Sequence, residues 1–167
     1  EKESIPWGVI VKNFQIEGIS IGDNLLEHFT EFEIKLEQNV DEHHNKYLQS
    51  LISNTRFKLY DVVQFTYRKD DKNYKLYQVM GIRDYFKGIK ECFTQKDKIS
   101  SEISNMLKDM DVQKDKRKDK NSDGGDVYTD TFLFDSKDMI LVQCYDFSKV
   151  KNMTSNLRVG ITSGEYP

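Results

Sequence analysis

The residues best suited to binding chemistry are oxygen-bearing side chains in one short, charged segment. Asp119, Asn121 and Asp123 alternate ahead of Gly124, and Asp130 takes the twelfth position counted from Asp119. This spacing is typical of a calcium-binding loop, in which a glycine allows the backbone to turn sharply between oxygen ligands. The twelfth residue is the shorter Asp instead of Glu, many lysines surround the motif, and a strand is expected to follow it. These departures favour the alternative, a solvated Asp-Gly-Gly turn.

The two cysteines are the next candidates for chemistry. Cys92 falls in a predicted helix and Cys144 in a predicted strand. They can form one disulfide, or they can remain buried thiols that behave as small hydrophobic side chains. A third possibility is a thiol or hydrolytic enzyme in which Cys144 pairs with His43 or His44. The sequence has no Gly-x-Ser-x-Gly elbow, no phosphate-binding glycine loop and no Cys-x-x-Cys motif, so we assign no catalytic residue and do not expect an enzyme.

Aromatic residues form a third candidate group, because many tyrosines lie on or beside predicted strands. Tyrosine offers a large contact area at a low cost in conformational entropy. A sheet face that helices do not cover would then expose some of these rings to a partner. The shortlist for such an interaction face is Tyr60, Phe65, Tyr67, Tyr77 and Tyr145. The alternative is that these rings are ordinary strand residues with half-buried packing.

Alternating apolar and polar residues predict the strands that would position these groups. Val63, Phe65 and Tyr67 alternate with polar residues, and a similar alternation spans 132–143. A period of two places successive side chains on opposite faces of a sheet, so each strand has at least one buried face. We expect one hairpin over 57–83, a second over 127–147 and a last strand over 157–162.

Capping signals and apolar spacing predict the helices. Ser20 with Asp23, and Thr30 with Glu33, have the spacing of a capping box, which predicts two short helices over about 20–38. An apolar stripe after Gly88 predicts a helix of about six turns.

The remaining segments contain few groups that could pack. Residues 1–15 are expected to form an extended arm or an edge strand, and the polar stretch 39–53 a loop or a poorly defined helical turn. Residues 113–126 are almost wholly charged or small, so we expect a mobile loop that cannot bury enough apolar area to offset ordering. The predicted fold class is α+β. A single domain over 16–167 would have an antiparallel sheet of about five strands, covered on one face by helices and built from two successive helix-plus-hairpin units.

Composition narrows the classes of partner. The net charge is −3 with both signs interspersed, which argues against nucleic-acid binding, because that function needs a basic face. No apolar run approaches the roughly 20 residues needed to span a bilayer, so no transmembrane segment is expected. The chain begins with Glu1, which is consistent either with removal of a leader or with trimming.

Four segments, 14–26, 60–65, 144–148 and 156–159, resemble an uncharacterised family of small exported marine bacterial proteins. The resemblance implies a removed leader, a periplasmic or secreted location and a Cys92–Cys144 disulfide, and it implies no activity. At the level of the fold, the expected order of elements is also distantly similar to β-lactamase-inhibitor-like domains and to outer-membrane assembly lipoproteins, which bind other proteins.

The expected function is therefore a non-enzymatic, exported protein–protein interaction or structural module with an unidentified protein partner and no cofactor. A calcium-dependent extracellular binding protein is the alternative, and a thiol or hydrolytic enzyme is the second alternative.

Overall fold

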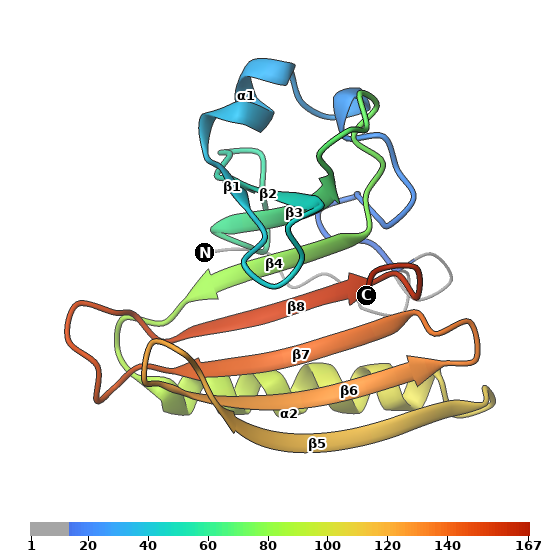
Figure 1. Ribbon diagram of the computed structural model, residues 1–167. Helices are drawn as coiled ribbons and strands as arrows, with labels where there is room; N and C mark the ends of the chain where they lie inside the picture. Colours follow the sequence, from blue (N-terminus) through green and yellow to red (C-terminus); the bar gives the residue numbers. More distant parts are fainter. Residues whose placement is uncertain (1–13) are drawn as a thin grey trace.

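The computed structural model describes residues 14–167, which are built around an eight-stranded antiparallel sheet (Figure 1). Two four-stranded meanders are joined by one long helix, α2 (Ile89–Met106). The first meander contains β1 (Gln38–Val40), β2 (Tyr47–Ile52), β3 (Val62–Arg68) and β4 (Gln78–Asp84). The second contains β5 (Val112–Lys120), β6 (Asp126–Phe134), β7 (Met139–Asp146) and β8 (Asn156–Thr162). The strand order is β1-β2-β3-β4-β8-β7-β6-β5, so the pairing of β4 with β8 unites the two meanders.

This architecture corrects the predicted fold class of about five strands covered by helices. The hairpins β3–β4 and β6–β7, the last strand and the long helix are where the sequence predicts them. The segments expected to be loops at 39–53 and 113–126 instead contribute β2 and β5. The alternation in β2 is hidden because the buried position between Leu48 and Ile52 is Ser50, whose hydroxyl bonds the carbonyl of Ile34 at 2.6 Å. The arm predicted at 1–15 lies outside the described residues, apart from its last two positions.

The core lies on one face of the sheet, which we call the helix face. Val63, Phe65 and Tyr67 are fully buried there, which confirms the alternation that predicted β3. In the second meander, Ile140 and Val142 occupy this face beneath α2, which packs chiefly on β7. On the opposite face, which we call the open face, no helix of residues 14–167 covers the second meander (Figure 1). None of the helices in residues 14–167 has the length and apolar character of a membrane-spanning segment.

Short helical segments cover the first meander. The Thr30–Glu33 capping box is confirmed at the start of α1 (Glu31–Leu36), where each residue bonds the backbone of the other. The Asp23 carboxylate accepts the Ser20 amide as predicted, at 2.9 Å, but the helix expected there is reduced to the 3-10 turn η3 (Leu25–Glu27). The six residues of α1 bury only Ile34 fully, so residues of the connecting segments, among them Phe29 and Phe57, complete the core over this half of the sheet.

Two glycines allow close packing where the meanders meet. A Cβ on Gly81 would lie 2.5 Å from Cγ of Tyr60, whose ring covers this position on the helix face. A Cβ on Gly160 in β8 would lie 2.3 Å from the backbone oxygen of Val79. Neither position can therefore hold a side chain without movement of the neighbouring strand or ring.

Candidate functional site

Strand β5 forms one edge of the sheet and is the most accessible regular element. It pairs with β6 over its full length of nine residues, from Val112 opposite Phe134 to Lys120 opposite Asp126. Within residues 14–167 nothing pairs with its other edge. Every β5 side chain after Val112 is exposed, so both the side chains and the outer backbone groups face solvent.

The hairpin turn and β6 explain why β5 is ordered although Val112 is its one apolar residue. The amide of Asn121 donates to the carbonyl of Gly125 at 2.8 Å, and Gly124 has φ of 92°, a backbone conformation that favours glycine. Across the pair, the ammonium of Lys118 lies 5.3 Å from the ring centroid of Tyr128, which in turn packs edge-on against Phe93 of α2. Side chains of β6 therefore anchor β5 to the core, although β5 itself buries little.

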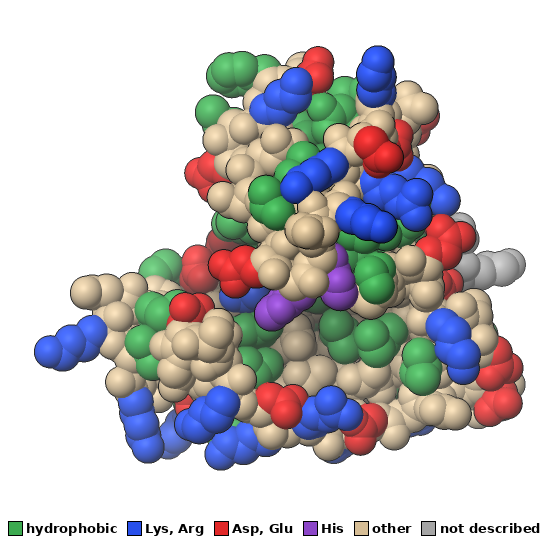
Figure 2. Space-filling view, in the orientation of Figure 1, with side chains coloured by type: hydrophobic (Ala, Val, Ile, Leu, Met, Phe, Trp, Pro, Cys, Tyr) green, Lys and Arg blue, Asp and Glu red, His purple; other side chains and the backbone are tan. Residues whose placement is uncertain are grey.

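The charges of β5 are sorted by face. Opposed residues in an antiparallel pair point to the same side, so the register with β6 assigns each side chain to a face. Four lysines lie on the helix face: Lys114, Lys116, Lys118 and Lys120. Charges of both signs lie on the open face: Asp115, Arg117 and Asp119. Figure 2 shows basic and acidic side chains along this lower rim of the molecule.

A cleft of about 600 Å³ separates α2 from β5 on the helix face. The helix wall is polar, with Ser101 and Asn105 among its residues, and the opposite wall includes Lys114. The floor is formed by Asp130 and Phe132 of β6. The cleft exists because α2 packs on β7 and β8, which leaves β5 without close packing to the helix.

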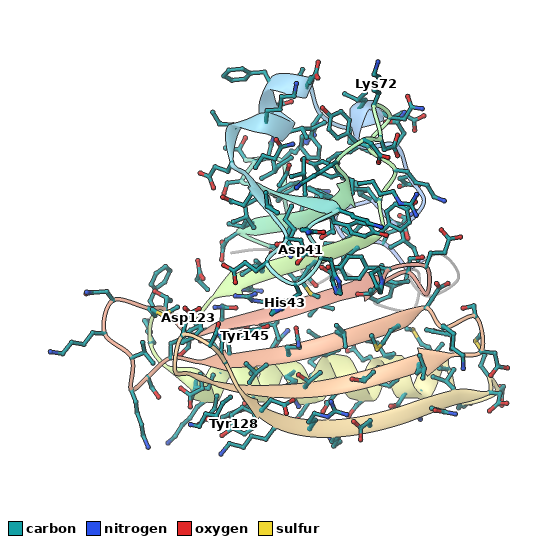
Figure 3. All side chains as sticks on the ribbon, viewed as in Figure 1. Asp41, His43, Lys72, Asp123, Tyr128 and Tyr145 are labelled. Carbon is teal, nitrogen blue, oxygen red and sulfur yellow. A yellow bond between two sulfur atoms is a disulfide. The ribbon has the colours of Figure 1, made fainter. Side chains whose placement is uncertain are left out.

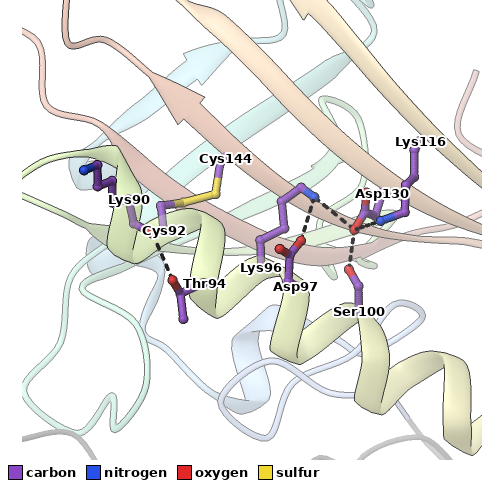
Figure 4. Close-up of polar contacts among 9 residues, drawn as sticks. All are labelled: Lys90, Cys92, Thr94, Lys96, Asp97, Ser100, Lys116, Asp130 and Cys144. Atoms are coloured by element: carbon purple, nitrogen blue, oxygen red, sulfur yellow. Dashed lines mark hydrogen bonds and ion pairs between the residues drawn. A yellow bond between two sulfur atoms is a disulfide. The ribbon is translucent and has the colours of Figure 1, made fainter.

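A buried ion pair lies at the floor of this cleft (Figure 4). The ammonium of Lys96 is 3.0 Å from Oδ2 of Asp130, with side chains only 8% and 5% exposed. The Ser100 hydroxyl donates to the same oxygen at 2.6 Å, and the exposed Lys116 ammonium lies 3.8 Å from it. Through these contacts Lys96 and Ser100, both on α2, are tied to Asp130 of β6.

A second depression, of about 460 Å³, flanks β5 on the open face. Its base includes Thr129, Leu141 and Gln143, and one wall includes Arg117 of β5. The Gln143 amide donates to the Thr129 hydroxyl at 3.1 Å, which fixes the polar part of this surface. The space-filling view shows the hollowed open face between the upper strands and β5 (Figure 2). Strand β5 is therefore flanked by a cavity on each face of the sheet.

A further charged group, Arg158 of β8, lies on the open face beside Tyr145, near the C-terminal end of β7. The Arg158 guanidinium lies 3.8 Å from the ring centroid of Tyr145 and donates through Nε to Asn156 at 2.9 Å. Burial lowers the pKa of Arg158. Burial, together with the nearby carboxylate of Asp61, raises the pKa of Asp84. Charge is thus partly desolvated at this junction of β4, β8 and β7.

The shortlist for the interaction face is corrected by the structure. Tyr60, Phe65, Tyr67 and Tyr77 are at most 6% exposed, so they cannot form an accessible docking surface. Phe65 and Tyr67 belong to the same alternation that defines the buried face of β3. Only Tyr145 is partly exposed, and Figure 3 shows it on the open side of the sheet.

The four predicted calcium ligands do not come together. Asp119 lies on the open face of β5, whereas Asp130 lies on the helix face of β6 and contacts Lys96. Asn121 and Asp123 belong to the hairpin turn, which Figure 3 places at the end of the two strands. The motif therefore runs through a hairpin, because residues after 125 continue as a strand. In the described part of the chain, no three His, Cys, Asp or Glu residues are grouped to hold a metal ion.

The disulfide alternative for the two cysteines is confirmed. Cys92 of α2 is bonded to Cys144 of β7 with Cα atoms 6.0 Å apart, and both residues are fully buried. The bond fastens α2 to the strand on which it packs (Figure 4). The sulfur of Cys144 is therefore not a free thiol that could pair with His43 or His44.

The edge formed by β5 is the feature that sequence reasoning missed. Its signal is an alternation of charge type instead of hydrophobicity, with lysine at every second position from 114 to 120. No protein-family model, curated protein or solved structure matches this chain.

Proposed function

We propose that this protein is a non-enzymatic, exported interaction module that binds an extended segment of a partner protein as a ninth strand along β5. The observation that carries the proposal is the nine-residue outer edge, which no described residue pairs. In this mode of recognition, main-chain hydrogen bonds supply affinity and alternate side chains supply specificity. Alternate side chains of the added strand would point toward the cleft beside α2 and toward the open-face groove.

The other sheet edge is a poor alternative. Strand β1 has only three residues, which offers few main-chain hydrogen bonds to an incoming strand. Strand β5 is three times as long, and its backbone is already held in extended form by β6. A partner segment therefore has to order only itself, which lowers the conformational entropy lost on binding.

The buried disulfide supports export. Disulfides persist mainly in oxidising compartments such as the periplasm and the cell exterior. The resemblance of 14–26 and 144–148 to an exported family points the same way and stays a prediction. The absence of an assigned catalytic group is consistent with a binding role, and the proposal does not depend on it.

Nuclear magnetic resonance titration with a nine-residue peptide of alternating threonine and glutamine tests strand addition. We expect the amide signals of β5 to shift and their hydrogen exchange to slow, while those of β1 remain unchanged. The matched control is the same peptide N-methylated at every residue, because methylation then removes the amide donors of both edges of the strand. Equal binding of both peptides, or no response in β5, would refute the proposed function.

A further inference from the structure

We infer that the strand accepted by β5 carries acidic side chains at alternate positions, all on the side that faces α2. This inference rests on the proposed function, since it specifies the chemistry of the added strand. The distribution of charge along the free edge of β5 favours an acidic segment of another protein as the added strand.

Cations outnumber anions on the helix face of the β5–β6 hairpin. The four lysines of β5 face only two acidic residues of β6, Asp126 and Asp130. The Lys120 and Lys118 ammonium groups lie 2.5 and 3.9 Å from Asp126, and the Lys116 ammonium lies 3.8 Å from Asp130. Lys114 forms no ion pair with any residue in 14–167. Carboxylates arriving on the outer side of β5 would therefore meet positive charge that β6 only partly neutralises.

The lysines of β5 occupy every second position, which is also the spacing of side chains on one face of an added strand. Side chains two residues apart on one face are separated by about 6.8 Å. Acidic residues at alternate positions of an antiparallel partner would thus lie directly opposite or diagonal to Lys114, Lys116 and Lys118. Opposite charges in such cross-strand positions stabilise the pairing, and like charges destabilise it.

On the open face, β5 carries both signs of charge, so the partner residues that fit there differ in charge from those that fit on the helix face. Asp115 and Arg117 form an ion pair at 3.6 Å, and Asp119 adds a second negative charge. Acidic residues on this face of the added strand would be repelled, so neutral or basic residues are expected there. The two faces together prefer a segment whose charge alternates, and they reject one that is acidic throughout.

The same charges make a second copy of this chain a poor occupant. A twofold pairing of two β5 strands keeps both helix faces on one side of the joined sheet. Lysines of one copy would then lie opposite lysines of the other, which destabilises the pair. The lysines therefore protect the edge from self-association, while they favour an acidic heterologous strand.

Three nonapeptides test the inference by isothermal titration calorimetry. They alternate threonine with glutamate, with glutamine or with lysine. We expect the glutamate peptide to bind on the order of tenfold more tightly than the glutamine peptide, and the lysine peptide to bind most weakly. The preference should shrink as ionic strength rises, because these side chains are exposed.

Charge reversal on the protein supplies the second arm. Lys114→Glu combined with Lys118→Glu should invert the preference, so that the lysine peptide binds more tightly than the glutamate peptide. The matched control is Lys69→Glu combined with Lys72→Glu, which makes the same change in net charge at exposed positions of the β3–β4 connection. Figure 3 shows Lys72 far from β5. This control should keep the original order of affinities. If the glutamate variants do not fold, Lys114→Gln with Lys118→Gln should still abolish most of the preference.

The outcomes separate the two proposals. Equal affinity for the glutamate and glutamine peptides, or an equal loss in the control variant, overturns the acidic preference and leaves strand addition intact. Undiminished binding of an N-methylated glutamate peptide overturns both, since the contact would then be electrostatic only. A dimer of the protein in which β5 amides are protected from exchange would overturn the argument against a second copy.

Discussion

Removal of the Cys92–Cys144 cross-link should lower the free energy of unfolding by about 4 kcal/mol. The bonded residues are 52 positions apart, and closing a loop of that length in the unfolded chain costs about this much in a chain-entropy model. Such a loss is large beside the 5–15 kcal/mol that stabilises a typical native protein. For a chain of this length it corresponds to a fall of about 8–16 °C in the melting temperature.

Urea unfolding followed by circular dichroism can separate the cross-link from the packing of the two sulfurs. The oxidised protein, the reduced protein and the double variant Cys92→Ala with Cys144→Ala are compared under the same conditions. The difference between oxidised and reduced protein measures the cross-link, because both keep the sulfur atoms. The difference between reduced protein and double variant measures the loss of two fully buried groups. The slope m should also rise when the bond is broken, because the unfolded chain then exposes more surface.

The double variant is its own control for the reductant, since its unfolding midpoint should not respond to dithiothreitol. A difference below about 1 kcal/mol between oxidised and reduced protein would refute the loop-closure reasoning. Free thiols in protein recovered from its native compartment, measured by mass after alkylation, would refute the bond itself.

Three further perturbations have defined outcomes. Asp130→Ala should cost on the order of 3 kcal/mol in urea unfolding, because it leaves the buried Lys96 ammonium with only the exposed Asp97 carboxylate, 3.8 Å away. Asp130→Leu with Lys96→Met should cost much less, because no buried charge then remains. Gly160→Ala should lower the free energy of unfolding by about 1–3 kcal/mol in the same assay, because its Cβ would overlap the backbone of β4. A variant as stable as the parent would contradict this close packing of β8 on β4. Burial and the Asp61 carboxylate raise the pKa of Asp84, so the folded protein holds the Asp84 proton more tightly than the unfolded chain does. The ionised Asp84 side chain therefore lowers the stability of the folded protein at neutral pH. This loss of stability disappears as the pH falls through the raised pKa toward the ordinary pKa of aspartate. Asp84→Asn should therefore melt at a higher temperature than the parent near pH 7 and show no advantage near pH 3, below the ordinary pKa of aspartate at about 3.9; an advantage of equal size at both values would contradict this assignment.

The sequence predicted those elements whose own side chains enter the core. Alternation at Val63, Phe65 and Tyr67 located β3, and the apolar stripe after Gly88 located α2, because each pattern reflects burial directly. The capping box at Thr30 was equally informative, since its two hydrogen bonds join residues only three positions apart. The similar pair Ser20 and Asp23 forms its backbone hydrogen bond but is followed only by the 3-10 turn η3, so a capping signal locates a start better than it predicts a length.

The elements that were missed depend on distant partners. Strand β5 contributes almost no buried apolar area, and it is extended because β6 supplies hydrogen bonds and packing. Ser50 occupies a core position of β2 only because the Tyr67 hydroxyl and the carbonyl of Ile34 satisfy its hydroxyl. The motif that begins at Asp119 has the spacing of a calcium loop, but pairing in β6 turns Asp130 toward α2. In each case the deciding contact lies far away in the sequence or is set by strand register.

The central position of β8 has a consequence for how the polypeptide matures. Strand β8 comes last in sequence among the eight strands, yet it fills the gap between β4 and β7. Before β8 pairs, the facing edges of β4 and β7 have no hydrogen-bond partners. Pairing of β8 with β4 then joins residues about 80 positions apart in the sequence. High contact order of this kind slows folding. A nascent chain interrupted before Asn156 would therefore leave the facing edges of β4 and β7 unpaired. We expect such a chain to aggregate or to be degraded instead of accumulating as a stable fragment.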